Sequence, residues 1–161
     1  MSITDYFTHS FRAEHRRLRD LLLSLVDAFR SGDAARVRTL VSCVSAAAGP
    51  SFRYEEEAMY PGLVPIVGRE HVAKLFTDHD GAIRELRELN DVSRAAELDT
   101  ERGIRLTRAL LRHVSDSDGL ALMAEVMPED DVVHILASRD AVVERDLDVL
   151  AWADQVRGRR V

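Results

Sequence analysis

The chain has 161 residues and a formal net charge of −6, and 46% of its residues are hydrophobic. This length fits one domain over residues 1–161, large enough to bury a core without a disulfide or a structural metal. The acidic balance disfavours non-specific nucleic-acid binding, which needs a basic face. No segment approaches the roughly 20 apolar residues of a membrane span, and the charged N-terminus is unlike an export signal. We therefore expect a cytoplasmic protein that binds neither nucleic acid nor membrane.

The first half of the chain predicts two long helices. Apolar residues recur at spacings of three and four over about residues 5–29, which is the period of an amphipathic helix. Gly32 and Asp33 are suited to end this helix and begin the next. Pro50 predicts a kink or a break in the second helix, and Tyr60 followed by proline indicates its end. The single cysteine, Cys43, lies among apolar residues of the second helix and is expected to be a small buried side chain.

The second half predicts three further helices, with connections at 61–68 and 91–99, over about residues 69–90, 100–124 and 128–156. Gly119 is a candidate interruption of the fourth helix. Pro128 and the acids after it are typical of a helix start. Four long helices with short connections fold most simply as an antiparallel four-helix bundle. We expect an all-α bundle over about residues 5–127 with an additional C-terminal helix, and Trp152 packed under that last helix.

Four ionisable residues lie on the apolar stripes of four different predicted helices, where charged groups are unexpected: His15, Glu55, His79 and His113. Leaving such groups buried and unpaired costs several kcal/mol each. Imidazoles and carboxylates converging from four helices would form a nitrogen and oxygen cage suited to iron, manganese or zinc. Each histidine alone is equally well explained as a hydrogen-bonded core residue. Glu55 could belong to an exposed acidic run, but its register with Phe52 and Met59 favours burial. Together they favour a metal.

Four segments then resemble the hemerythrin-type (HHE cation-binding) domains, in that family's order: EHRRLRDLLLSL, SFRYEEEAMYP, DHDGAIREL and LLRHVSDSD. The resemblance implies a bundle that holds two iron ions, with His15, His79 and His113 as ligands and Glu55 as a bridging carboxylate. It makes Asp118, five residues after His113, the second bridging carboxylate. Helix geometry is less favourable for Asp118, because five residues turn a helix about 140° away, and a bulge near Gly119 would be needed. Asp116 has a better angle but no counterpart in the family.

Two positions depart from the family pattern. Ser51 stands where a histidine usually precedes the glutamate, and Leu75 stands where oxygen carriers have a further histidine. A site with fewer ligands leaves more positions for water or substrate, which suits catalysis better than reversible oxygen carriage. Among nearby residues that could fill a gap, Glu56 is the best candidate if a kink at Pro50 turns it toward the core. His9, His71 and His134 lie off the stripes and are expected at the surface.

Three functions follow from this pattern. The first is a non-haem protein, with two iron ions or with manganese or zinc, that reacts with O2, peroxide or NO. The second is a sensing module in which iron or oxygen occupancy changes helix stability without turnover. The third is a degenerate, metal-free bundle that acts as a scaffold or small-molecule binder. The sequence names no organic substrate and leaves the oligomeric state and the choice between enzyme and sensor open.

Overall fold

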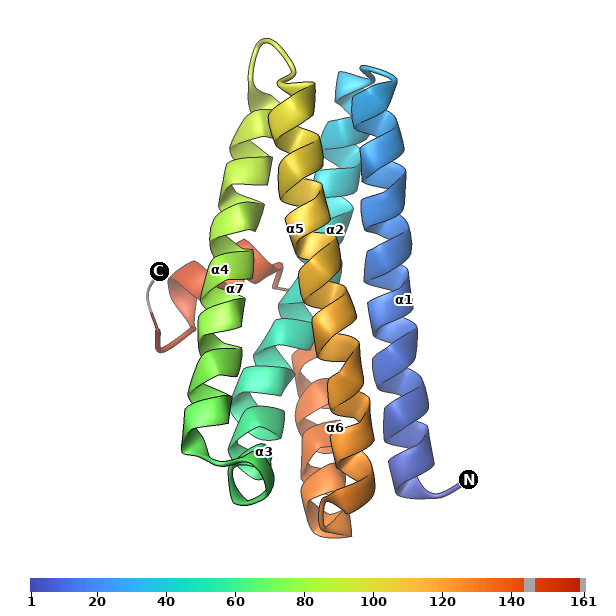
Figure 1. Ribbon diagram of the computed structural model, residues 1–161, viewed down its shortest axis with the longest axis vertical. Coiled ribbons are helices and arrows are strands. Elements are labelled where there is room, and N and C mark those ends of the chain that lie inside the picture. The colour runs from blue at the N-terminus through green and yellow to red at the C-terminus, as the bar shows by residue number, and fades with distance from the viewer. Residues whose placement is uncertain (144–146, 160–161) are drawn as a thin grey trace.

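The computed structural model describes residues 1–143 and 147–159, and over these residues the protein is all-α with no strand (Figure 1). Helix α1 (Ile3–Arg30) begins at a capping box, in which the Ser2 hydroxyl accepts the Asp5 backbone N–H and the Asp5 carboxylate accepts that of Ser2. Gly32 has a φ of 67°, in the left-handed region that glycine adopts without strain. Asp33 caps the second helix, so the predicted turn is confirmed.

The chain between the second and third long helices differs from expectation. Helix α2 (Ala34–Tyr54) passes through Pro50 without ending, and it is followed by a π-helical turn, η1 (Glu55–Met59). Residues 61–68 were expected to form a connection, but most of them lie in a further helix, α3 (Tyr60–Val67). Two prolines are compatible with this helix because it is short and one of them occupies its first turn.

The later helices follow the predicted order. Helix α4 (Arg69–Arg94) is one turn longer than expected, and α5 (Thr100–Asp118) is capped by Asp99. The chain then narrows into a 3₁₀ helix, η2 (Gly119–Val126), which confirms the interruption at Gly119. The expected single helix over 128–156 is wrong. It is replaced by α6 (Glu129–Val143) and α7 (Val149–Gln155), because Asp148 is extended and caps a new helix by accepting the Ala151 N–H.

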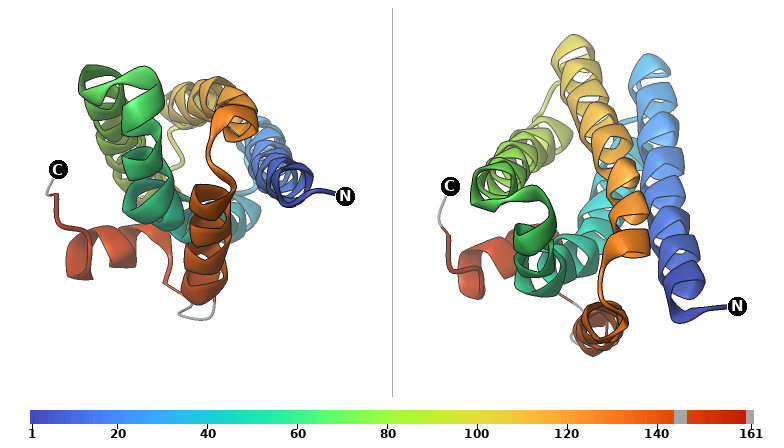
Figure 2. Two further views of the ribbon diagram at one scale, coloured as in Figure 1. Left: turned by 90° about the horizontal axis from the view of Figure 1, so that it is seen from below. Right: turned by 60° about the horizontal axis from the view of Figure 1, so that its bottom comes forward.

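Four long helices, α1, α2, α4 and α5, form the bundle. Helix α1 packs against α2 and α5, and α4 packs against the same two helices from the other side, as the expected bundle requires (Figure 1). Helix α6 contacts α1, α2 and η1, whereas α7 lies across α2 and α4 (Figure 2). The C-terminal part of the chain therefore covers the bundle at the level where α2 gives way to the π turn.

The interior contains two apolar clusters, one toward each end of the bundle. The first includes Leu18, Phe52, Leu110 and Trp152, and it confirms that Trp152 packs under the C-terminal helix. The second includes Phe11 and is completed by η2 and α6. The four candidate ligands lie in a polar layer between the two clusters: His15, Glu55, His79 and His113. The clusters thus form an apolar boundary on both sides of this polar layer.

Helix geometry corrects one expectation about the core. Cys43 is exposed rather than buried. The buried positions of α2 include Val41 and Val44, and each residue turns a helix by about 100°, so Cys43 lies away from the stripe that these valines form. In the described part of the chain, no helix is long and apolar enough to cross a membrane.

Candidate metal centre

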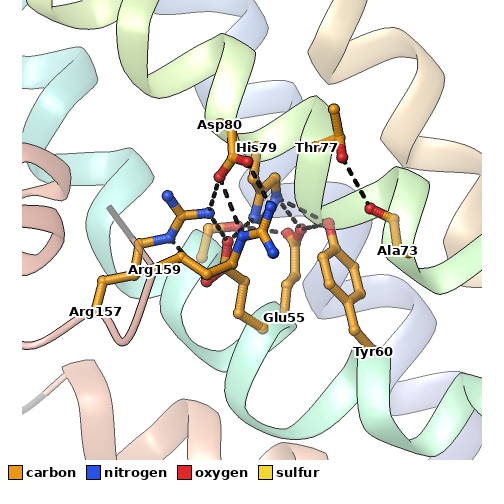
Figure 3. A network of polar contacts seen from close by, with 10 residues as sticks. Glu55, Tyr60, Ala73, Thr77, His79, Asp80, Arg157 and Arg159 are labelled. Carbon is orange, nitrogen blue, oxygen red and sulfur yellow. Dashed lines mark hydrogen bonds and ion pairs between the residues drawn. The ribbon is translucent and has the colours of Figure 1, made fainter. Parts of the chain in front are cut away.

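His79 lies at the centre of the polar layer. Its side chain is fully buried in the middle of α4, and both ring nitrogens face carboxylates from η1. Nδ1 lies 3.0 Å from Oε1 of Glu56, and Nε2 lies 3.1 Å from Oε2 of Glu55 (Figure 3). The hydroxyl oxygen of Tyr60 lies 2.8 Å from the same Nε2. The imidazole is therefore enclosed by polar groups of one short segment.

The π turn explains why two consecutive glutamates reach one histidine. In a regular helix, neighbouring side chains point about 100° apart, so they do not share a face. Here the Tyr60 backbone N–H donates to the carbonyl of Glu55, five residues back, and the wider turn inserts an extra residue. Glu55 and Glu56 are both buried as a result, while Glu57 stays exposed. The expectation that Glu56 could turn toward the core is confirmed, and the π turn that follows α2 accounts for it.

Glu55 accepts hydrogen bonds from three directions. Besides His79, it accepts the Ser51 hydroxyl at 3.1 Å and the Tyr60 hydroxyl at 3.2 Å. Ser51 thus contacts the carboxylate from the position where the family pattern has a histidine. Tyr60, which the sequence suggested only as a helix end, is part of the site. The signal that could have revealed it is its spacing of five from Glu55, which aligns two residues only in a π turn.

Glu55 and His79 shift each other's pKa. Burial alone would raise the pKa of Glu55, but the hydrogen bond and charge of His79 outweigh it, and the pKa is lowered overall. Burial alone would lower the pKa of His79, but its hydrogen bonds to Glu55 and Glu56 raise the pKa overall. Each partner thus favours the charged form of the other. The buried histidine and carboxylate therefore stabilise each other in the absence of a cation.

His113 completes a nitrogen pair with His79. The two ring centroids lie 5.4 Å apart, and the Phe52 ring stacks on His79 at 4.1 Å and lies 5.4 Å from the His113 ring. Burial, together with the charge of His79, lowers the pKa of His113 to about 4. His113 is therefore neutral at pH 7, and a neutral imidazole has the lone pair that metal binding requires.

His15 and Asp118 lie toward the α1 and α5 side of the layer. The buried His15 ring donates from Nδ1 to the Phe11 carbonyl at 2.9 Å, and its Nε2 lies 3.0 Å from the Ser117 hydroxyl. Helix α5 remains regular up to Asp118, so the five-residue step turns this carboxylate away from His113, and Ser117 takes the inward position. Asp118 instead lines a pocket of about 290 Å³ beside His15. Within the described residues, Asp118 has no hydrogen-bond or ion-pair partner.

The C-terminal segment contributes arginine contacts around the site that the sequence did not predict. The buried guanidinium of Arg157 donates to both carboxylate oxygens of Glu56, at 3.0 and 2.7 Å, and to Asp80 at 2.7 Å (Figure 3). Arg159 donates to Asp80 at 2.7 Å. Asp80 follows His79 on α4, and these arginines lower its pKa although burial opposes them. No local pattern signals this contact, because it depends on the path of the chain after α6.

The remaining histidines are exposed, as expected: His9, His71 and His134. They take no part in the layer described above. The buried histidines are therefore the two that sequence reasoning assigned to the first and third helices, with His113 half-buried beside them.

The model of the hemerythrin HHE cation binding domain matches residues 6–124, and the chain belongs to this family. The match covers the bundle and ends within η2, so α6, α7 and Arg157 lie outside it. No curated protein and no solved structure matches the chain. The recognition made from the four sequence segments is therefore confirmed at the level of the family.

The donor set fits a metal in its chemistry. Glu55, His79 and His113 supply one carboxylate and two imidazoles from three elements, and His79 has the supporting carboxylate that metal-bound histidines commonly have. As the side chains stand, no group of three His, Cys, Asp or Glu in residues 1–143 and 147–159 could hold a metal ion. Nε2 of His79 faces Glu55 and Tyr60, and Nε2 of His15 faces Ser117. Cation binding would have to replace these hydrogen bonds.

Proposed function

We propose that this protein is a non-haem metal-binding protein, with two iron ions as the first candidate and manganese or zinc as alternatives, that reacts with or senses O2, peroxide or NO. The metal ligands would be His15, Glu55, His79 and His113, and Asp118 would join them if the end of α5 turned its carboxylate inward from the pocket beside His15. One observation supports the proposal above the others. His79 and Glu55 face each other in a buried layer of the bundle, and Glu56 hydrogen-bonds to the other ring nitrogen of the same imidazole.

In this proposal, Glu56, Tyr60 and Phe52 each have a separate role. Glu56 accepts the Nδ1–H of His79 and so leaves Nε2 as the nitrogen available to a cation. Tyr60 holds a proton between Nε2 and Glu55, since burial and the charge of Glu55 raise its pKa. Phe52 covers the face of the imidazole and excludes water from it. A bound iron ion would supply redox chemistry toward O2, peroxide or NO.

The two departures from the family pattern favour reaction or sensing over oxygen carriage. The Ser51 hydroxyl already donates a hydrogen bond to Glu55, and Leu75 packs against the second apolar cluster. Neither position supplies a nitrogen ligand. A centre with fewer protein ligands has more positions for exogenous molecules.

A row of consecutive ion pairs supports a second candidate function, in which the protein is a metal-free bundle. Arg157, Glu56, His79 and Glu55 form consecutive ion pairs, so the buried charges are compensated without a cation. A paired network of this kind can persist in a core because each charge has a partner. The layer would then serve only to fix the helices in register.

Metal analysis separates these candidates. The protein is purified after growth with added iron and also reconstituted anaerobically with Fe²⁺, beside His79→Gln and the surface control His134→Gln. We expect stoichiometric iron in the parent and in His134→Gln, and its loss in His79→Gln. Absence of metal in the parent, before and after reconstitution, would overturn the proposal in favour of the metal-free bundle.

Turnover then separates reaction from sensing. The iron-loaded protein is tested for consumption of O2 and peroxide, and its melting temperature is compared with that of the chelator-treated form. Consumption that disappears in His79→Gln supports a reactive centre. Stoichiometric iron without consumption, combined with a large metal-linked rise in melting temperature, supports the sensor.

A further inference from the structure

Arg157 bridges two elements at the site. Its guanidinium donates to Glu56 on η1 through two nitrogens and to Asp80 on α4 through one of them. His79 lies between these contacts, since it is the neighbour of Asp80 and its Nδ1 lies 3.0 Å from Glu56. A single side chain from the C-terminal segment therefore joins the two elements that supply the central histidine and the central carboxylate.

The surroundings of Arg157 hold it in place. Its side chain is only 1% exposed, its backbone N–H donates to the Trp152 carbonyl at 2.9 Å, and its guanidinium lies 5.6 Å from the Trp152 ring. Trp152 is packed in the first apolar cluster. A charge this deeply buried is stabilised only by specific partners, so its position is set by Glu56 and Asp80.

We propose that Arg157 is a positioning residue for the metal centre, acting through Glu56 on His79. The two hydrogen bonds from Arg157 orient the Glu56 carboxylate toward His79. Glu56 accepts the Nδ1–H of His79, and Nε2 of the ring then faces Glu55, where a cation would bind. The C-terminal segment is thus a working part of the site, although it lies outside the matched family domain. This inference rests on the proposed function for its metal readout only.

Arg159 provides a matched control. It is two residues away and carries the same charge, but within the described residues its guanidinium hydrogen-bonds to Asp80 and not to Glu56. Arg157→Gln and Arg159→Gln remove equal charge from the same segment. A difference between the two variants therefore reports the contact with Glu56 and not a general change in electrostatic potential.

The first experiment uses the metal-free protein and measures solvent exchange of the His79 Nδ1–H by ¹⁵N NMR. We expect a slowly exchanging proton in the parent and in Arg159→Gln, and at least tenfold faster exchange in Arg157→Gln, because Glu56 loses two of its three hydrogen bonds. Equal exchange in Arg157→Gln and the parent would overturn the proposal. This result does not depend on whether the protein binds metal, so it separates the inference from the proposed function.

The second experiment titrates the same three proteins with Co²⁺ and follows its absorption spectrum. Loss of a residue that supports a metal-bound histidine typically weakens affinity about 10–100-fold, and we expect this for Arg157→Gln. We expect less than a threefold change for Arg159→Gln. Equal weakening in both variants would contradict the proposal, since it would point to net charge alone.

A double-mutant cycle tests whether Arg157 acts through Glu56. If it does, the double variant Arg157→Gln/Glu56→Gln binds Co²⁺ no more weakly than Glu56→Gln alone. Additive losses would show that Arg157 affects the site by another route and would overturn the proposal. Circular dichroism and urea unfolding confirm that each variant is folded at the temperature of the titration, and Arg157→Lys is the fallback variant if Arg157→Gln does not fold.

Discussion

The Nε2 nitrogen of His15 lies 3.0 Å from the hydroxyl oxygen of Ser117, which ties α1 to α5 at the level of the candidate metal centre. Nδ1 of the same ring donates to the Phe11 carbonyl, and the Ser117 hydroxyl also donates to the Val114 carbonyl at 3.3 Å. The nitrogen that would bind a metal is therefore occupied by a protein group. Metal binding at His15 and this hydrogen bond compete.

Replacing Ser117 by alanine should separate stability from metal affinity. Loss of one buried hydrogen bond should lower the free energy of unfolding of the metal-free protein by about 1 kcal/mol. The same energy no longer opposes metal binding, so the affinity for Co²⁺ should rise about fivefold. Urea unfolding and Co²⁺ titration measure the two effects, with the exposed Ser115→Ala as control. Weaker Co²⁺ binding in Ser117→Ala would show that the hydroxyl supports the ligand geometry and does not compete with it.

Replacing Tyr60 by phenylalanine should destabilise the protein. The phenol contacts both Glu55 and His79 in a fully buried position, and both would lose a polar partner. We expect the free energy of unfolding to fall by about 1–3 kcal/mol, the usual range for a buried group left unsatisfied. Tyr6→Phe is the matched control, since Tyr6 is exposed, and it should change stability by less than about 0.5 kcal/mol. Equal stability of the two variants in urea would contradict the role given to the Tyr60 hydroxyl.

His113 should make the metal-free protein less stable as the pH falls. Its pKa is about 4 in the folded protein, whereas an unfolded chain has a histidine pKa of about 6.5. Between these values the unfolded state binds more protons, so the free energy of unfolding decreases as the pH falls through this window. His79 has a raised pKa and acts in the opposite sense, so the comparison must be made between the parent and His113→Gln. The variant should show a weaker acid decline in urea unfolding from pH 7 to pH 4. An unchanged pH profile would contradict the pKa given to His113.

Gly49→Ala should displace the C-terminal segment. A Cβ at this position would collide with the backbone of Leu147 and Asp148, where the chain crosses α2 just before α7. Overpacking of this kind costs about 1–3 kcal/mol. Gly81→Ala is the control, because Gly81 lies in α4 with only ordinary contact at 3.9 Å, and alanine there should stabilise the helix by about 1 kcal/mol.

Limited proteolysis and urea unfolding distinguish the two glycine variants. Gly49→Ala should release α7 to the protease earlier than the parent and unfold at lower urea, while Gly81→Ala should resist both. If Gly49→Ala kept its C-terminal segment protected, the close crossing at Gly49 would not be what holds α7 in place.

Local sequence patterns were enough to predict the helical class, the family and the register of the central residues. The periodicity of apolar residues is a local property, because each turn of a helix repeats after 3.6 residues. It therefore predicted that His15, Glu55 and His79 point inward, and the structure brings these groups into one buried layer. Their role as metal ligands stays a prediction. The turn at Gly32 and the end of α5 followed from equally local rules.

The further groups that surround His79 depend on how the whole chain folds. The π turn changes the register by one residue, so Glu56 and Tyr60 join Glu55 on a face that a regular helix would not give them. Arg157 reaches Glu56 across 101 residues of sequence, after a helix break at Asp148 and a close crossing of α2 at Gly49. Such a contact depends on the path of the whole chain and on the cost of burying an unpaired charge, and neither is encoded in a local pattern.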